Sequence, residues 1–206
     1  AALLLFAETL FQLERYAESR EQFSQLARNE SLDTTPQVRH LTTLRLGEIA
    51  ANENDWSTAD QFAANLREAT EHYDFAGQAF NYLGRVAIAK GEMDEARQWL
   101  RKSAEAAQVA EREVAARSLW LIGETYFLQN NFTAALESYH QVASFADSPH
   151  WCAAALLQSA KCYESLERWS DAVTAYSTLI DNYPSSHYVV EATERLAAAQ
   201  SQGMVR

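Results

Sequence analysis

Small residues recur along the chain at a spacing close to forty positions. Five of them serve as anchors, at intervals of 40, 37, 39 and 37 residues: Ser19, Ala59, Ala96, Ala135 and Ala172. Another small residue stands twelve positions before every anchor: Ala7, Gly47, Gly84, Gly123 and Ala160. Such a period is typical of repeat proteins, in which each unit packs only on its neighbours.

Large residues keep the same register. Four positions after the anchors stand Phe23, Ala63, Leu100, Tyr139 and Tyr176, and three before them stand Tyr16, Trp56, Met93, Phe132 and Trp169. Short polar turns divide each unit: Glu14-Arg15, Asn54-Asp55, Gly91-Glu92, Asn130-Asn131 and Glu167-Arg168. Facing small residues let two helices approach closely, and large residues fill the remaining space. The pattern therefore predicts one helical hairpin, written five times.

Composition favours helices throughout. Glycine (6) and proline (3) are scarce, and no segment alternates as a strand would. We predict a single all-α domain over residues 1–206, with units near 1–35, 36–74, 75–112, 113–149 and 150–186. The segment 187–206 is either half of a sixth unit or a cap. We favour the cap, because Glu191, Glu194, Arg195 and Gln200 give it a polar outer face.

These columns resemble the tetratricopeptide repeat family, and the last unit carries the closest match. It reads Ala160-Lys161-Cys162-Tyr163, Trp169-Ser170-Asp171-Ala172, Tyr176 and Tyr183-Pro184. The resemblance implies a right-handed α-solenoid that binds partners on its concave face. The ending Tyr183-Pro184-Ser185-Ser186 is similar to bacterial envelope repeat proteins, namely the outer-membrane assembly lipoprotein and the Tol-Pal periplasmic repeat protein. It implies a periplasmic location, with the cytoplasm as the alternative.

The family's groove positions lie on the first helix of each hairpin. Carried over by offset from the anchors, the candidate partner-binding residues are Leu44, Glu48, Asn81, Arg85, Ile88, Trp120, Glu124, Phe127 and Lys161. Trp120 and Phe127 would form an aromatic anchor, or else pack between neighbouring units. Glu48 and Glu124 flank Arg85 in this column, so we expect part of the charge to cancel. Glutamates at Glu8, Glu48 and Glu124 argue against a clamp for a partner's terminal carboxylate.

The formal net charge is −11, spread evenly over both halves. An acidic chain repels phosphate backbones, so we expect no nucleic-acid partner and favour a protein partner with a basic segment. The first residues, Leu3 to Phe6, are apolar but too short to span a membrane. They predict an uncovered edge that packs on a further unit of a longer protein or on a second copy.

Chemistry-bearing residues do not converge. The five histidines are scattered among different units, His150-Trp151-Cys152 reads as a packed or capping segment, and Cys152 and Cys162 are too far apart on one helix to form a disulfide. We expect no metal site, no cofactor and no enzyme activity. The sequence predicts a non-catalytic protein-interaction scaffold. The alternative is a regulatory or sensor arm of a larger signalling protein, enzyme or transcription regulator.

Overall fold

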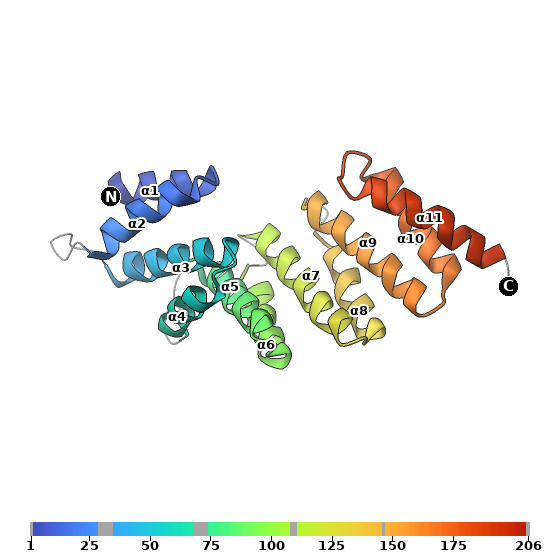
Figure 1. Ribbon diagram of the computed structural model, residues 1–206, viewed down its shortest axis with the longest axis horizontal. Helices are drawn as coiled ribbons and strands as arrows, with labels where there is room; N and C mark the ends of the chain where they lie inside the picture. Colours follow the sequence, from blue (N-terminus) through green and yellow to red (C-terminus); the bar gives the residue numbers. More distant parts are fainter. Residues whose placement is uncertain (1, 29–34, 68–73, 108–110, 146, 205–206) are drawn as a thin grey trace. The chain divides into compact units, whose positions relative to one another are not determined.

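The computed structural model describes residues 2–28, 35–67, 74–107, 111–145 and 147–204. In these ranges there are eleven helices and no strand (Figure 1). The helices are α1 (Ala2–Gln12), α2 (Tyr16–Arg28), α3 (Pro36–Asn52), α4 (Trp56–Leu66), α5 (Ala76–Ala89), α6 (Met93–Ala107), α7 (Arg112–Leu128), α8 (Phe132–Val142), α9 (Pro149–Ser165), α10 (Trp169–Asn182) and α11 (Val189–Met204). The predicted all-α helical repeat fold is confirmed.

The chain forms two compact units, residues 1–99 and 100–206, and the boundary falls within α6. In unit 1, α1 packs on α2 and α3 on α4, while a stacked contact between Phe80 and Trp99 joins α5 to α6. In unit 2, α7 packs on α8, α9 on α10, and α10 on α11. Odd-numbered helices from α1 to α9 are the first helices of hairpins, and even-numbered helices are the second helices.

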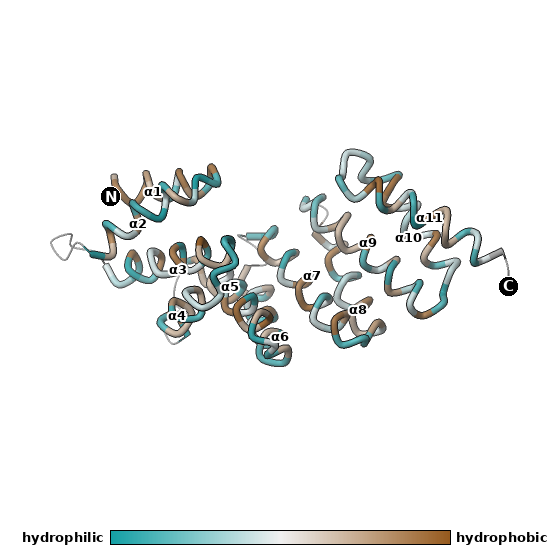
Figure 2. The backbone as a smooth tube through the Cα atoms, in the orientation of Figure 1, coloured by the Kyte–Doolittle hydropathy of each residue, from teal (hydrophilic) through white to brown (hydrophobic). Residues whose placement is uncertain are grey.

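The anchor residues lie at the centre of each hairpin. All five are fully buried: Ser19, Ala59, Ala96, Ala135 and Ala172. The residues four positions later are buried as well, and all of them except Ala63 are bulky, so four of the five second helices present a small residue and then a bulky one to their partners. Figure 2 colours the chain by hydropathy and shows that hydrophobic and hydrophilic positions are mixed within the helices.

The small residue on the first helix makes room for a tyrosine. A Cβ added at Gly123 would collide with the ring of Tyr139, which comes from the second helix of the same hairpin. A Cβ at Gly47 would collide with Tyr82 from the following hairpin, and would lie 3.1 Å from Cβ of Phe62. At these two glycines, the side chain of a tyrosine from a neighbouring helix therefore packs directly against the backbone of the first helix.

The five hairpin turns share one backbone conformation. The residue five positions before each anchor has a positive φ: Glu14 (57°), Asn54 (62°), Gly91 (79°), Asn130 (58°) and Glu167 (56°). In every turn the next residue donates its N–H to the carbonyl five positions back, as Arg168 does to Tyr163 at 2.8 Å. This is the hydrogen bonding of a Schellman C-cap. Asp55 and Asn131 then cap the following helix through the N–H groups of Thr58 and Ala134.

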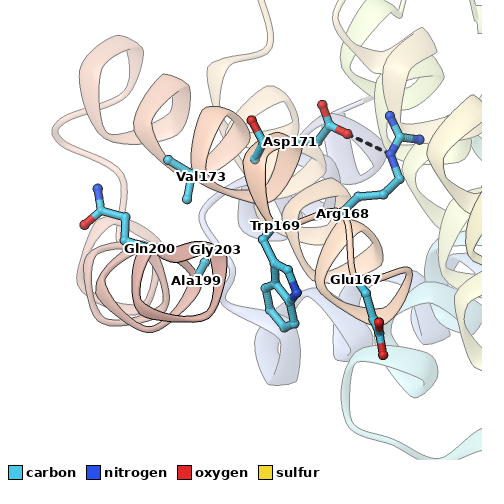
Figure 3. A pocket seen from close by; sticks show the side chains of 9 residues that line it. Glu167, Arg168, Trp169, Asp171, Val173, Ala199, Gln200 and Gly203 are labelled. Carbon is cyan, nitrogen blue, oxygen red and sulfur yellow. Dashed lines mark hydrogen bonds and ion pairs between the residues drawn. The ribbon is translucent and has the colours of Figure 1, made fainter. Parts of the chain in front are cut away.

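The two ends of the chain differ in how they are covered. Leu5 and Phe6 of α1 are 71% and 52% exposed, whereas Leu3 and Leu4 pack against the core of the first hairpins. At the other end, α11 buries Ala192 and Ala199 against α10. A cavity of about 470 Å³ remains beside these two helices, lined by Trp169 of α10 and Gly203 of α11 among others (Figure 3).

Candidate partner-binding surface

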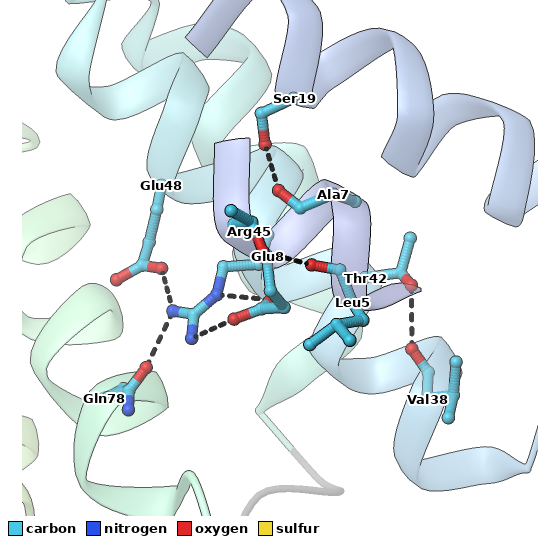
Figure 4. A network of polar contacts seen from close by, with 10 residues as sticks. Leu5, Ala7, Glu8, Ser19, Val38, Thr42, Arg45, Glu48 and Gln78 are labelled. Atoms are coloured by element: carbon cyan, nitrogen blue, oxygen red, sulfur yellow. Dashed lines mark hydrogen bonds and ion pairs between the residues drawn. The ribbon is translucent and has the colours of Figure 1, made fainter. Parts of the chain in front are cut away.

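Consecutive first helices of unit 1 are joined by a buried arginine that the predicted groove did not include. Arg45 of α3 donates from Nε and Nη2 to the two carboxylate oxygens of Glu8, at 2.9 and 3.1 Å (Figure 4). Its Nη1 donates to Glu48 Oε2 and to Gln78 Oε1 of α5, both at 2.7 Å. Burial would lower the pKa of Arg45, but Glu48 and Glu8 raise it above its usual value. The guanidinium thus ties α1, α3 and α5 together.

Around Arg85, part of the expected charge interaction is present, because the charge of Glu48 acts on the guanidinium. Glu48 is paired with Arg45, and Arg85 Nη2 donates to Asn52 Oδ1 at 3.0 Å. Burial lowers the pKa of Arg85, although the field of Glu48 partly offsets this effect. Arg85 of α5 therefore contacts the preceding repeat, whereas Glu48 is bound to Arg45 of its own helix.

The remaining candidates of unit 1 are largely covered. Leu44 has no exposed surface and Asn81 is 4% exposed, so neither side chain can touch a bound partner directly. Ile88 is half-buried. We leave Leu44 and Asn81 out of the proposed binding surface for this reason.

Unit 2 repeats the same kind of connection. Gln158 of α9 donates from Nε2 to Glu124 Oε1 of α7 at 2.8 Å, and the hydroxyl of Tyr139 donates to the same oxygen at 2.5 Å. Lys161 forms an ion pair with Glu191 of α11 at 2.7 Å, and Glu164 forms one with Arg195 at 2.5 Å. Polar pairs thus link each first helix to α11 or to the next first helix.

Two tryptophans meet beside these polar pairs. Trp120 of α7 and Trp151 of α9 are half-buried, with ring centroids 5.4 Å apart and planes tilted by 47°. Neither indole Nε1 has a hydrogen-bond partner among the described residues. Buried tryptophans usually find a partner for this N–H group, so the pair is unusual. We call Trp120, Glu124, Trp151 and Gln158 the α7–α9 face.

Phe127, the other aromatic candidate of α7, contacts the second helix of its own hairpin. Its ring packs edge to face on Phe132, the first residue of α8, with centroids 5.5 Å apart. Trp151 was missed as a binding candidate because it lies in the first turn of α9, outside the offsets carried over. In the sequence, Trp151 stood out only as part of the segment His150-Trp151-Cys152. Its neighbour Cys152 is a buried free thiol.

The described residues contain no cluster of metal ligands and no helix that could span a membrane. No three or more His, Cys, Asp or Glu side chains among them are placed to hold a metal ion. None of the described helices combines the length and hydrophobicity needed to cross a membrane.

Solved structures of similar fold come from several bacteria. A thermophilic TPR protein from Thermus thermophilus is 19% identical, with a TM-score of 0.64 and 97% of both chains covered. The C-terminal part of a TPR repeat-containing protein from Cytophaga hutchinsonii is 17% identical, with a TM-score of 0.70, covering 96% of this chain and 71% of that one. The apo form of RapI is 11% identical, with a TM-score of 0.78, covering 98% of this chain and 59% of RapI. These identities show a shared fold alone.

No curated protein matches the chain in sequence at a significant level. Family models described as tetratricopeptide repeats match residues 75–148 and 154–186, which together make up just over half of the chain. These matches fall on α5 to α10, where the anchors and the left-handed turns recur. The chain belongs to the tetratricopeptide repeat family, whose fold generally serves as a scaffold for protein–protein interactions.

Proposed function

We propose that this protein is a non-catalytic scaffold that holds a peptide segment or helix of a partner protein against the α7–α9 face. The observation that carries the proposal is the contact between Trp120 and Trp151, whose indole N–H groups have no partner among the described residues. Tryptophan is enriched among the residues that dominate binding energy in interfaces. Bound main-chain carbonyls would give these N–H groups acceptors once the rings adjust.

The distribution of charge also supports this face. In unit 1 the groove carboxylates Glu8 and Glu48 are occupied by Arg45. Glu124 of unit 2 is held only by the neutral groups of Tyr139 and Gln158. Unit 2 therefore keeps a carboxylate without a direct ion pair beside an aromatic pair, which suits a partner with a basic segment.

The test uses peptides selected on the intact chain. Peptides from a random 12-residue phage library are enriched on wild-type protein, and their Kd values are measured by fluorescence polarisation. We expect the double variant Trp120→Ala, Trp151→Ala to weaken binding at least about a hundredfold, since truncated hot spots typically cost 2 kcal/mol or more each. The matched control is Trp99→Ala, which removes a tryptophan from a second helix in unit 1. Equal loss in both variants, or none in the double variant, would refute the proposal.

The alternative function is a regulatory or sensor arm of a larger signalling protein, enzyme or transcription regulator. The full reading frame separates the two: a lipoprotein signal favours an envelope scaffold, and a helix-turn-helix or nucleotide-binding domain favours the regulator. A periplasmic location, with the cytoplasm as alternative, stays part of the proposal and is tested by cell fractionation. Self-association through the exposed Leu5 and Phe6 is a further proposal, tested by sedimentation of a Leu5→Glu variant.

A further inference from the structure

Glu124 has one saturated and one open carboxylate oxygen. Oε1 accepts hydrogen bonds from the Tyr139 hydroxyl at 2.5 Å and from Gln158 Nε2 at 2.8 Å. No described residue donates to Oε2 or forms an ion pair with Glu124. Lys161, one turn further along α9 than Gln158, directs its ammonium group to Glu191 at 2.7 Å. The side chain is therefore held in place by neutral groups and has no direct ion pair, although the charge of Lys161 acts on it from a distance.

The amide of Gln158 adds a second open acceptor. Because its Nε2 donates to Glu124, the orientation of the amide is set, and a flipped amide would place two oxygens against each other. Its Oε1 is buried and has no donor among the described residues. Two oxygens from neighbouring helices thus lack donors at one place.

An aromatic surface stands next to these oxygens. Trp120 precedes Glu124 by four residues on α7, so both lie on one side of that helix. Trp151 lies seven residues before Gln158 on α9 and contacts Trp120, with Ala154 and Ala155 as small residues in between. The guanidinium of Arg117 already lies 5.8 Å from the centre of the Trp151 ring. The Trp151 ring therefore already lies beside a planar cation of the chain itself, which shows that this ring can hold a guanidinium at cation–π distance.

We propose that the α7–α9 face binds an arginine side chain of the partner, whose guanidinium donates to Glu124 Oε2 and stacks on the Trp120–Trp151 pair, and which also donates to Gln158 Oε1 once the half-buried Gln158 side chain moves to expose it. This inference rests on the proposed function and names the chemical group that the scaffold recognises. A guanidinium has five N–H donors in a planar fork, so it can serve two oxygens at once and still offer a flat face to an indole. Lysine has a compact ammonium and lacks that flat face.

The position of Glu124 is costly without such a ligand. Burial raises the pKa of Glu124, although the hydrogen bonds from Tyr139 and Gln158 and the charge of Lys161 pull the pKa back down. Carboxylates with a shifted pKa cluster at functional sites, and here the shift accompanies the open Oε2 described above. Tyr188 also feels the field of Glu124, and its pKa is raised by burial and then by that charge. The negative charge of Glu124 would therefore attract the guanidinium of the partner.

The experiment compares two synthetic peptide pools on the full chain. One pool is Ac-Ala-X-X-Arg-X-X-Ala-amide, with X an equal mixture of Ala, Leu, Phe, Pro and Ser, and the other replaces Arg by citrulline, which has nearly the same shape but no charge. Binding is followed by the indole N–H signals in ¹H–¹⁵N spectra, assigned by single Trp→Phe variants. We expect the arginine pool to shift the Trp120 and Trp151 signals with a Kd at least about tenfold lower than the citrulline pool.

Two isosteric variants separate recognition from folding. Glu124→Gln keeps the hydrogen bonds from Tyr139 and Gln158, and should remove the preference for arginine. Glu113→Gln, on the exposed first turn of α7, should keep that preference. If both pools shift the two indole signals equally, the binding face stands and arginine recognition is overturned. If the arginine pool causes no shift at millimolar concentration, arginine recognition is overturned as well. If it shifts only signals other than those of Trp120 and Trp151, both arginine recognition and the proposed face are overturned.

Discussion

At the residue scale, the presence or absence of one Cβ atom decides whether a neighbouring side chain can pack against a helix. Gly123 is one example, because the ring of Tyr139 occupies the place where a Cβ would lie. Gly203 near the end of α11 is a useful contrast, because a Cβ there would lie 3.6 Å from Cβ of Trp169, at ordinary contact distance. The same substitution should therefore destabilise the protein at Gly123 and not at Gly203.

Gly123→Ala should lower the free energy of unfolding by about 1–3 kcal/mol, the usual cost of forcing extra volume into a packed core. Gly203→Ala should leave stability unchanged or raise it by up to about 1 kcal/mol, since alanine favours helix. Urea denaturation followed by circular dichroism measures both. A stable Gly123→Ala protein would mean that Tyr139 does not pack on this helix.

Glu124 links stability to pH with a definite sign. Its pKa is raised in the folded state, mainly by burial. A raised carboxyl pKa stabilises the fold below the ordinary pKa of glutamate, and this contribution is lost as the pH rises through the folded value. Glu124→Gln cannot titrate. The stability of this variant relative to wild type should therefore be greater at pH 7.5 than at pH 4, as measured by urea denaturation at both values. A relative stability that falls with rising pH would contradict the sign.

At the element scale, turns and polar pairs set how helices connect. The turn register was predictable, because the polar pairs at Glu14, Asn54, Gly91, Asn130 and Glu167 mark the places where φ is positive. The partners of Arg45 were not predictable, since Glu8 and Gln78 stand 37 and 33 residues away along the chain. Which side chains meet across helices depends on crossing geometry, and a column of offsets does not contain that geometry.

Replacing Glu167 by glycine should stabilise the last hairpin. Glutamate is strained in its left-handed conformation at φ 56°, while glycine adopts it freely. After subtracting the extra entropy of glycine in the unfolded chain, we expect a gain of roughly 0.5–1 kcal/mol. The matched control is Glu194→Gly on the exposed face of α11, which should lose about 1 kcal/mol. Thermal melts of the two variants should therefore shift in opposite directions.

Arg45 should be one of the most sensitive positions of unit 1. Arg45→Met leaves the carboxylates of Glu8 and Glu48 facing each other in a half-buried place, and removing one partner of such a network typically costs about 3 kcal/mol. Arg15→Met breaks only the exposed pair with Glu18 and should leave the urea midpoint unchanged. Similar midpoints for both variants would show that the buried network contributes little.

At the scale of the whole molecule, the sequence predicted the architecture better than the surface. Fully buried anchors from Ser19 to Ala172 follow from a period that any packed helical repeat must keep. The candidate partner-binding residues were predicted less well from this period. Leu44 and Asn81 are buried in the core, and Trp151, which contacts Trp120, was not among the candidates. The buried positions recur with the repeat, whereas a binding surface depends on the side chains that differ from one repeat to the next.

The five tryptophans allow one spectrum to locate a bound partner. Trp56, Trp99 and Trp169 lie on the second helices α4, α6 and α10, and Trp169 also lines the cavity beside α11. A selected peptide with a nitroxide spin label should broaden the indole signals of Trp120 and Trp151 and leave the other three sharp. Broadening of Trp169, Trp56 or Trp99 with sharp Trp120 and Trp151 signals would contradict binding at the α7–α9 face.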